Sequence, residues 1–96
     1  MHDYELTLII APRVDQEGVD AILDAIKQFV EVDGGTLNSV KPWGLRRLAY
    51  AIKDMGEGQY VFIELRMPPH KVAPLERTLK LNESVLRHLF VRTDEE

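Results

Sequence analysis

The sequence contains no cysteine among its 96 residues. Disulfides, thiolate nucleophiles, cysteine-ligated zinc and iron–sulfur clusters are therefore excluded. The sequence also lacks an apolar run of about 18–20 residues, which a membrane helix needs; the densest early run, Leu6–Ala11, is far too short. Its first residues lack the basic start and apolar core of a signal peptide. We therefore expect a cytoplasmic protein without membrane contact.

Motifs of catalysis and cofactor binding are equally scarce. The three histidines, His2, His70 and His88, are scattered, and none pairs with a carboxylate at metal-ligand spacing. No glycine-rich phosphate loop is present. Acylphosphatases of this size carry a glycine-rich loop with an arginine after the first strand, whereas Ala11–Asp15 holds no glycine. We expect no enzyme activity, metal, cofactor or small-molecule substrate.

Charge is distributed unevenly along the chain, although the formal net charge is only −4. Residues 1–40 hold eight acids against two bases, residues 41–92 hold ten bases against five acids, and residues 93–96 add three acids. Binding responds to the local field rather than to the total charge. The pattern therefore indicates a basic face able to contact phosphate, or else an ordinary mixed surface in solvent.

Hydrophobic periodicity predicts the order strand, helix, strand, strand, helix, strand. Strands are expected over 4–10, 36–53, 60–67 and 85–92, with a hairpin turn over 54–58. One helix begins after the N-cap Asp15 and ends before Gly34-Gly35; the other lies between Pro68-Pro69 and Asn82. Pro42 and Gly44 predict a bulged edge strand. The inward face of the last strand is ambiguous, because its apolar residues do not alternate cleanly.

This order is the split β-α-β pattern of an α+β, ferredoxin-like fold, a four-stranded antiparallel sheet with two helices on one face. No repeat, low-complexity stretch or linker divides the chain. We therefore expect a single domain over residues 1–96, with an acidic frayed end over 93–96. The fold alone does not fix the function, because it hosts many unrelated activities.

Residues 41–53 combine four bases with a tryptophan and a tyrosine. Guanidinium groups pair with phosphates, and both guanidinium groups and aromatic rings stack on unpaired nucleic-acid bases. Arg46 and Arg47 face opposite sides of a strand unless a bulge intervenes, and Gly44 favours such a bulge. A charged edge strand that resists aggregation, with Trp43 partly buried, explains the segment equally well.

The run from Gly44 to Lys53 reads Gly-Leu-Arg-Arg-Leu-Ala-Tyr-Ala-Ile-Lys, which resembles the signature of bacterial small-subunit ribosomal protein six. Tyr4-Glu5, Met67-Pro68 and residues 57–60 and 81–87 resemble the same family, so the likeness covers nearly the whole chain. The resemblance implies a ferredoxin-like sheet in the order 4-1-3-2. It also implies a structural component of the cytoplasmic ribosome that binds the central domain of 16S rRNA and pairs with small-subunit protein eighteen as a heterodimer.

With this resemblance, bases of the signature and of the outer strands become the candidate RNA contacts: Arg46 and Arg47 first, then Lys41, Lys53, Arg87 and Arg92. The candidate partner contacts are the aromatic residues Trp43, Tyr50, Tyr60 and Phe62. Tyr60 and Phe62 are expected on the helix-free sheet face. Gln59 stands where RNA-recognition motifs carry an aromatic residue, which favours protein docking over RNA stacking on that face. The alternative function is a small-molecule-sensing, homodimeric ferredoxin-like module, for which no residue argues specifically.

Overall fold

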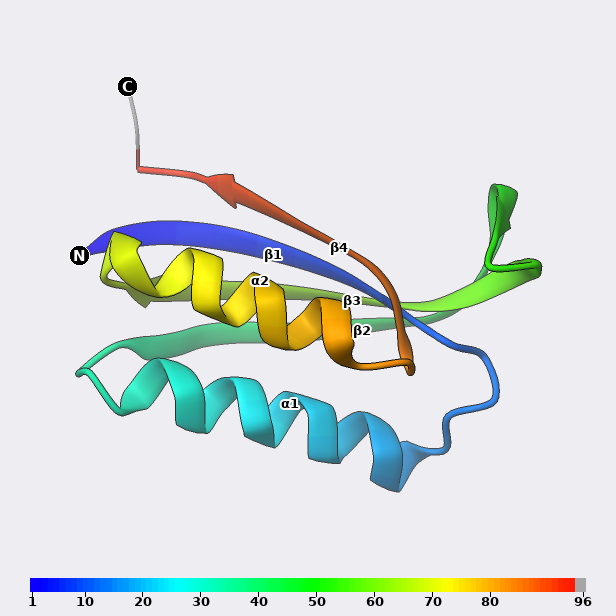
Figure 1. The fold of residues 1–96 in the computed structure, drawn as a ribbon, viewed down its shortest axis with the longest axis horizontal. Helices are drawn as coiled ribbons and strands as arrows, with labels where there is room; N and C mark the ends of the chain where they lie inside the picture. Colours follow the sequence, from blue (N-terminus) through cyan, green and yellow to red (C-terminus); the bar gives the residue numbers. More distant parts are fainter. Residues whose placement is uncertain (95–96) are drawn as a thin grey trace.

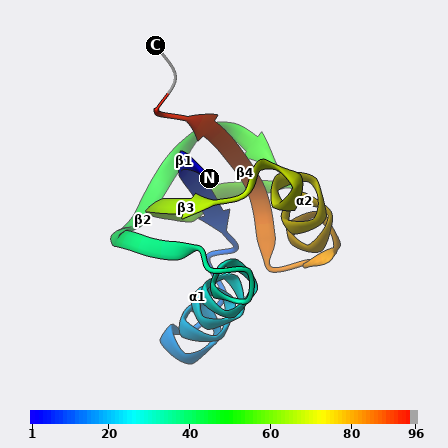
Figure 2. The same ribbon diagram turned by 90° about the vertical axis from the view of Figure 1, so that its left-hand side faces the viewer.

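The computed structural model describes residues 1–94 and contains the expected elements in the expected order (Figure 1). The elements are β1 (His2–Ile10), α1 (Gln16–Glu31), β2 (Thr36–Ile52), β3 (Met55–Met67), the short 3-10 helix η1 (Pro69–Lys71), α2 (Val72–Leu81) and β4 (Val85–Arg92). The strands pair antiparallel in the order β2-β3-β1-β4. Both helices lie on one side of this sheet (Figures 1 and 2). These findings confirm the ferredoxin-like fold and its predicted strand order.

The main core lies between the sheet and the helices because the two central strands alternate in polarity. Every second residue of β1 and β3 is buried against α1 and α2, as the sequence predicted for β3. The residues between them, Tyr60, Phe62, Glu64 and Arg66 in β3, face the side without helices. The most deeply buried core residues are Leu6, Leu8, Ile10, Val30, Val61, Ile63, Leu65, Met67 and Leu75.

Helix α1 is capped at both ends as predicted. The Asp15 side chain accepts a hydrogen bond of 2.8 Å from the Gly18 amide, which satisfies a donor of the first turn. At the other end Gly34 adopts φ +82°, and the Gly35 amide donates to the Val30 carbonyl over 3.1 Å. This exit is specific for glycine, because a Cβ on Gly35 would stand 2.5 Å from the carbonyl oxygen of Arg66.

Lys71 is the one charged residue that is buried within residues 1–94, with 6% of its surface exposed. Its ammonium donates to the Phe29 carbonyl, lies 3.4 Å from Oδ2 of Asp33 and sits 4.3 Å from the centroid of the Phe29 ring. The Phe29 carbonyl belongs to the last turn of α1, where carbonyls have no partner inside the helix. Lys71 thereby ties η1 to the end of α1.

The β2–β3 hairpin is longer than predicted, and its turn lies elsewhere. The turn expected over residues 54–58 was wrong, because Ile52 pairs with Met55 and only Lys53 and Asp54 remain between the strands. These two residues have φ values of 50° and 63°, as a two-residue hairpin of type I′ requires. The glycines that suggested a loop, Gly56 and Gly58, lie inside β3.

A second, smaller apolar cluster holds the outer part of this hairpin. It consists of Ile9, Ala11, Leu48 and Leu86. Ile9 points away from the main core, because its strand neighbours Leu8 and Ile10 point into it. The β2–β3 register is interrupted between Arg47 and Ile52, where Leu48 packs into this cluster. The hairpin is therefore fixed to the rest of the molecule on the side opposite the helices.

A bulge resolves the ambiguity of the last strand. Ile9 pairs with Arg87 and Ile10 pairs with Val85, so Leu86 is the extra residue. Val85 joins the main core, whereas Leu86 joins the second cluster. Beyond the bulge, Phe90 packs against the main core. Its neighbours on either side, Leu89 and Val91, are exposed on the helix-free face.

The end of β4 contacts the start of β1. Within the frayed end expected over 93–96, the Thr93 amide donates to the Asp3 carbonyl over 2.9 Å, and Asp94 accepts a 2.8 Å hydrogen bond from Nε of Arg92. Residues 95–96 of that expectation lie outside the described residues. No helix of residues 1–94 is long and apolar enough to cross a membrane.

Candidate nucleic-acid and protein interface

Three aromatic side chains meet on the helix-free face and form what we call the aromatic surface (Trp43, Tyr60 and Phe62). The ring centroids of Trp43 and Phe62 are 4.6 Å apart, and those of Tyr60 and Phe62 are 6.3 Å apart. Trp43 is the extra residue of a bulge in edge strand β2, where Gly44 adopts φ +79°. The predicted bulged edge strand is thereby confirmed, and it leaves Trp43 55% exposed.

The apolar part of this face continues across the sheet. Thr7 pairs with Phe62 on one side and with Leu89 on the other, so the three side chains form one row. Leu89 and its strand neighbour two residues on, Val91, are both exposed. Sequence reasoning missed these two residues, because the bulge at Leu86 hides the alternation of β4 and only the pairing register reveals it.

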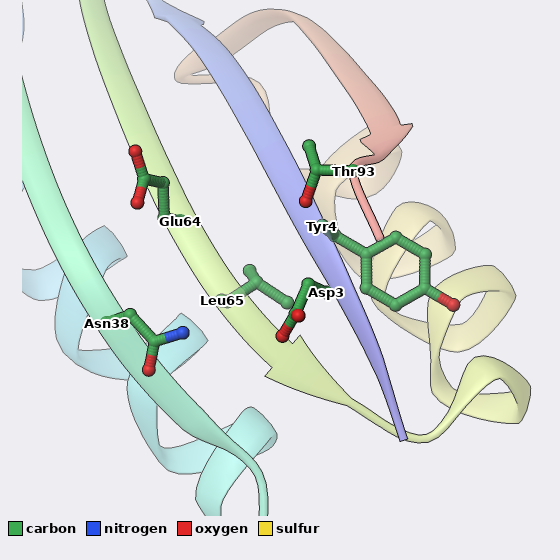
Figure 3. A pocket seen from close by; sticks show the side chains of 6 residues that line it. All are labelled: Asp3, Tyr4, Asn38, Glu64, Leu65 and Thr93. Carbon is green, nitrogen blue, oxygen red and sulfur yellow. The ribbon is translucent and has the colours of Figure 1, made fainter. Parts of the chain in front are cut away.

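Carboxylates border the apolar part at the end of the face away from the hairpin. Glu5 pairs with Glu64, and Asp3 pairs with Arg66, whose Nη1 lies 3.1 Å from the aspartate Oδ1. Figure 3 shows Asp3 and Glu64 on neighbouring strands beside a hollow of about 350 Å³, with Tyr4 extending toward α2. The carboxylates outnumber the single guanidinium, so this end of the face has a negative potential.

Two of the six predicted RNA contacts lie beside the aromatic surface. Lys41 pairs with Phe62, and the guanidinium carbon of Arg46 lies 6.0 Å from the centroid of the Trp43 ring. Arg46 and Arg47 pair with consecutive residues of β3 and therefore face opposite sides. The bulge at Gly44 precedes both arginines, so it does not place them on one surface as its position suggested.

The remaining predicted contacts lie elsewhere on the molecule. Nη1 of Arg87 donates to the Tyr50 hydroxyl over 2.6 Å, so Tyr50 lies with β4 and apart from the aromatic surface. Lys53 and Arg87 line one hollow. Arg92 lies at the far end of β4, where its hydrogen bond holds the pKa of Asp94 below its usual range. Within residues 1–94 no group of three or more His, Asp or Glu could hold a metal ion.

The fold places the chain among ferredoxin-like α+β proteins, with clustered aromatic rings and flanking bases on its open sheet face. The family model of ribosomal protein S6 matches residues 3–92. The chain belongs to the ribosomal protein S6 family, as its signature indicated. It is 44% identical over 94 residues to small ribosomal subunit protein bS6 of Acidothermus cellulolyticus, covering 98% of each chain. It is 38% identical over 95 residues to bS6 of Desulforamulus reducens, covering 99% of this chain and all of the relative.

Solved structures agree with this assignment. The crystal structure of 30S ribosomal protein S6 from Thermotoga maritima superimposes with a TM-score of 0.87 at 29% identity, covering 96% of this chain and 87% of that chain. The C-terminal domain of the MgtC protein from Mycobacterium tuberculosis shares the fold alone. It superimposes with a TM-score of 0.65 at 15% identity, covering 99% of this chain and 90% of that chain. The family makes the chain a small-subunit protein of the cytoplasmic ribosome, in a generally structural, non-enzymatic class.

Proposed function

We propose that the protein binds the central domain of 16S rRNA as a heterodimer with small-subunit protein eighteen. The observation that carries this proposal is the position of Arg46 over the Trp43 ring, 6.0 Å from its centroid. It joins a guanidinium, a group suited to phosphate binding, to an aromatic cluster whose Trp43 ring is left 55% exposed by residues 1–94. One surface can thereby meet a protein and an RNA side by side.

The aromatic surface is the docking site for the protein partner. Its acidic border, with Asp3, Glu5 and Glu64, repels RNA phosphates and attracts a basic protein. Gln59 gives no additional stacking position, because its Nε2 donates to the carbonyls of Ala11 and Val14 on the helix side. Leu89 extends the apolar contact area. A partner rich in basic residues would also offset the net charge of −4.

The bases contact RNA around the margin of this docking site. Lys41 and Arg46 lie beside the aromatic surface, and Arg47 projects from the opposite side of the same hairpin. A separate basic region consists of Lys53 and Arg87, and the Tyr50 hydroxyl contacts this arginine. Arg92 lies at the far end of β4. The proposed RNA contacts therefore follow the two edge strands, β2 with the turn after it and β4.

The test is binding of the purified chain to a central-domain 16S RNA fragment, with and without protein eighteen, across a salt series. We expect binding that depends on the partner and weakens steeply with salt. Trp43→Ala should abolish or weaken heterodimer formation, since exposed aromatic anchors dominate interfaces. Val32→Ala, which truncates an exposed apolar side chain at the C-cap of α1, is the control and should leave heterodimer formation unchanged. Absence of RNA binding in every condition would refute the proposal.

The alternative, a small-molecule-sensing homodimer, has weaker support. Small-molecule sites are mostly apolar and usually measure about 300–1,000 Å³. The apolar hollow between α1 and α2 measures about 90 Å³, and the hollows of about 350 and 380 Å³ are lined largely by polar and charged residues. That function would require a stable homodimer and a ligand-dependent rise in melting temperature. The family match favours the ribosomal interpretation instead.

A further inference from the structure

A second basic site lies where the tip of the β2–β3 hairpin approaches β4 and the end of α2. Its hollow of about 380 Å³ is lined by cationic groups over an apolar floor of Leu79, Val85 and Leu86. We call it the basic hollow and define it by Lys53 from the hairpin turn, Lys80 from the last turn of α2, and Arg87 and His88 from β4. Figure 2 shows the hairpin arching toward the β4 side of the sheet, which brings these distant segments together.

Two groups of the basic hollow, Arg87 and His88, are held in place by neighbours. Tyr50 accepts one hydrogen bond from Arg87 at 2.6 Å, which orients the guanidinium and leaves its other donors for a ligand. His88 is paired with Glu76 at 3.0 Å, and this carboxylate does not line the hollow. No residue lining the hollow is acidic within the described chain. The side chains thus present three cations with no lining carboxylate to neutralise them.

The positive charge continues along α2. A neighbouring hollow of about 260 Å³ shares Lys80 and His88 with the first and adds Arg77 and Glu76, whose carboxylate is the partner of His88. The basic side chains therefore form a continuous track rather than an isolated site. The track consists of Lys53, Arg87, Lys80 and Arg77. A track of this kind fits an extended polyanion better than a small free anion, because successive phosphates of a nucleic-acid backbone can follow it.

We propose that the basic hollow binds a backbone phosphate of the RNA, with Lys80 as a direct contact together with Lys53 and Arg87. This inference rests on the proposed RNA-binding function and adds to it a second anchoring point, remote from the aromatic surface. Lys80 lies outside the signature segment, on a helix that shows only its apolar stripe in the sequence. Its role becomes visible only when the hairpin, α2 and β4 are assembled.

The test uses the heterodimer with protein eighteen and the same central-domain RNA fragment across a salt series. Lys80→Gln removes one phosphate contact. We therefore expect RNA affinity about five- to eightfold weaker at about 0.1 M monovalent salt, and a log–log salt slope shallower by about 0.7–0.9. Arg87→Gln should act in the same direction. Lys27→Gln, on the exposed face of α1, is the matched control and should change neither quantity.

The possible outcomes distinguish the basic hollow from the proposed RNA-binding function. The basic hollow alone would be overturned if the wild type binds RNA normally and the Lys80→Gln and Lys27→Gln variants show the same dependence of RNA affinity on salt. No RNA binding by the wild type would overturn the proposed function and this site with it. Inorganic phosphate is titrated separately by NMR. If it saturates the hollow at millimolar concentration while RNA leaves the Lys80 and Arg87 amide signals unmoved, the site binds free phosphate and the RNA assignment is wrong.

Discussion

The backbone of Gly58 in β3 lies so close to Ile9 of β1 that a Cβ at position 58 would stand 2.4 Å from Cγ2 of Ile9. Cβ atoms essentially never approach other heavy atoms so closely. Ile9 belongs to the second apolar cluster, which fixes the outer hairpin. The absence of a side chain at Gly58 therefore decides how closely the hairpin can pack.

Gly58→Ala should lower the free energy of unfolding by about 1–3 kcal/mol, the usual effect of overpacking a well-filled site. Urea unfolding monitored by circular dichroism measures the change. Gly56→Ala is the matched control in the same strand, because a Cβ there meets nothing within 4 Å. It should leave stability unchanged or raise it by up to about 1 kcal/mol. Equal stabilities for the two variants would contradict the proposed packing role.

The two signature arginines should respond differently to substitution. Only Arg46 lies over the ring of the single tryptophan. Arg46→Ala should therefore alter the fluorescence of Trp43, and Arg47→Ala should leave it unchanged. If both arginines contact RNA as proposed, replacing both by alanine should weaken RNA assembly and flatten its salt dependence. Fluorescence spectra and the salt series test the two statements separately, and unchanged assembly of the double variant would exclude the RNA role.

Lys71→Ala should lower the free energy of unfolding by about 1.5–3 kcal/mol, because the Phe29 carbonyl loses its charged donor at the end of α1. Asp33→Asn should cost less than about 1 kcal/mol, since Asp33 is half exposed and its ion pair is screened. Lys27→Ala, an exposed lysine on α1, should change stability by less than about 0.5 kcal/mol. Urea unfolding measures the free energy of unfolding of the three variants. If Lys71→Ala leaves this free energy unchanged, the buried ammonium does not stabilise the fold.

Asp94 should couple stability to pH at the end of β4. The hydrogen bond from Arg92 lowers the pKa of Asp94 in the folded state, so the folded carboxyl binds protons more weakly than the unfolded one, whose pKa is about 3.9. Its stabilisation is fully present well above the unfolded pKa and is lost as pH falls through the lower folded pKa. The stability difference between wild type and Asp94→Asn should therefore shrink on acidification from pH 7 toward pH 2. Carboxyl-carbon NMR of Asp94 measures the pKa directly, and a value at or above the ordinary one would contradict the expectation.

Periodicity predicted the fold well because the central strands and α1 show their burial directly in the sequence. Leu6, Leu8 and Ile10 alternate strictly, and Asp15 marks the start of α1. The hairpin turn could not be placed the same way, because glycines 56 and 58 suggested a loop. The left-handed turn residues are Lys53 and Asp54; aspartate is a common turn residue, but lysine is not, so the pair does not mark the turn. Gly58 is instead required by a contact with Ile9, which lies 49 positions earlier in the chain.

The candidate site was predictable only as a set of residue types. The basic and aromatic composition of residues 41–53 indicated Trp43 and Arg46, and their contact is what the structure adds. Tyr50 was grouped with the other aromatic residues, yet its hydroxyl meets Arg87, 37 positions away. Lys80 and Leu89 gave no signal, because each gains its neighbours only through strand register and helix packing. Charge and aromaticity are local properties of a sequence, whereas a surface is made by segments that are distant along the chain.

The two apolar clusters differ greatly in size, and this difference sets the order in which parts of the molecule can open. The main core joins all four strands and both helices, whereas the outer hairpin depends on Ile9, Ala11, Leu48 and Leu86. We therefore expect the outer part of the hairpin, beyond the bulge at Trp43, to open locally while the main core stays packed. Arg46 and Lys53 belong to this outer part of the hairpin and its turn. We therefore expect the part of the chain that carries these proposed RNA contacts to open most readily, so that it can adjust its position while the domain stays folded.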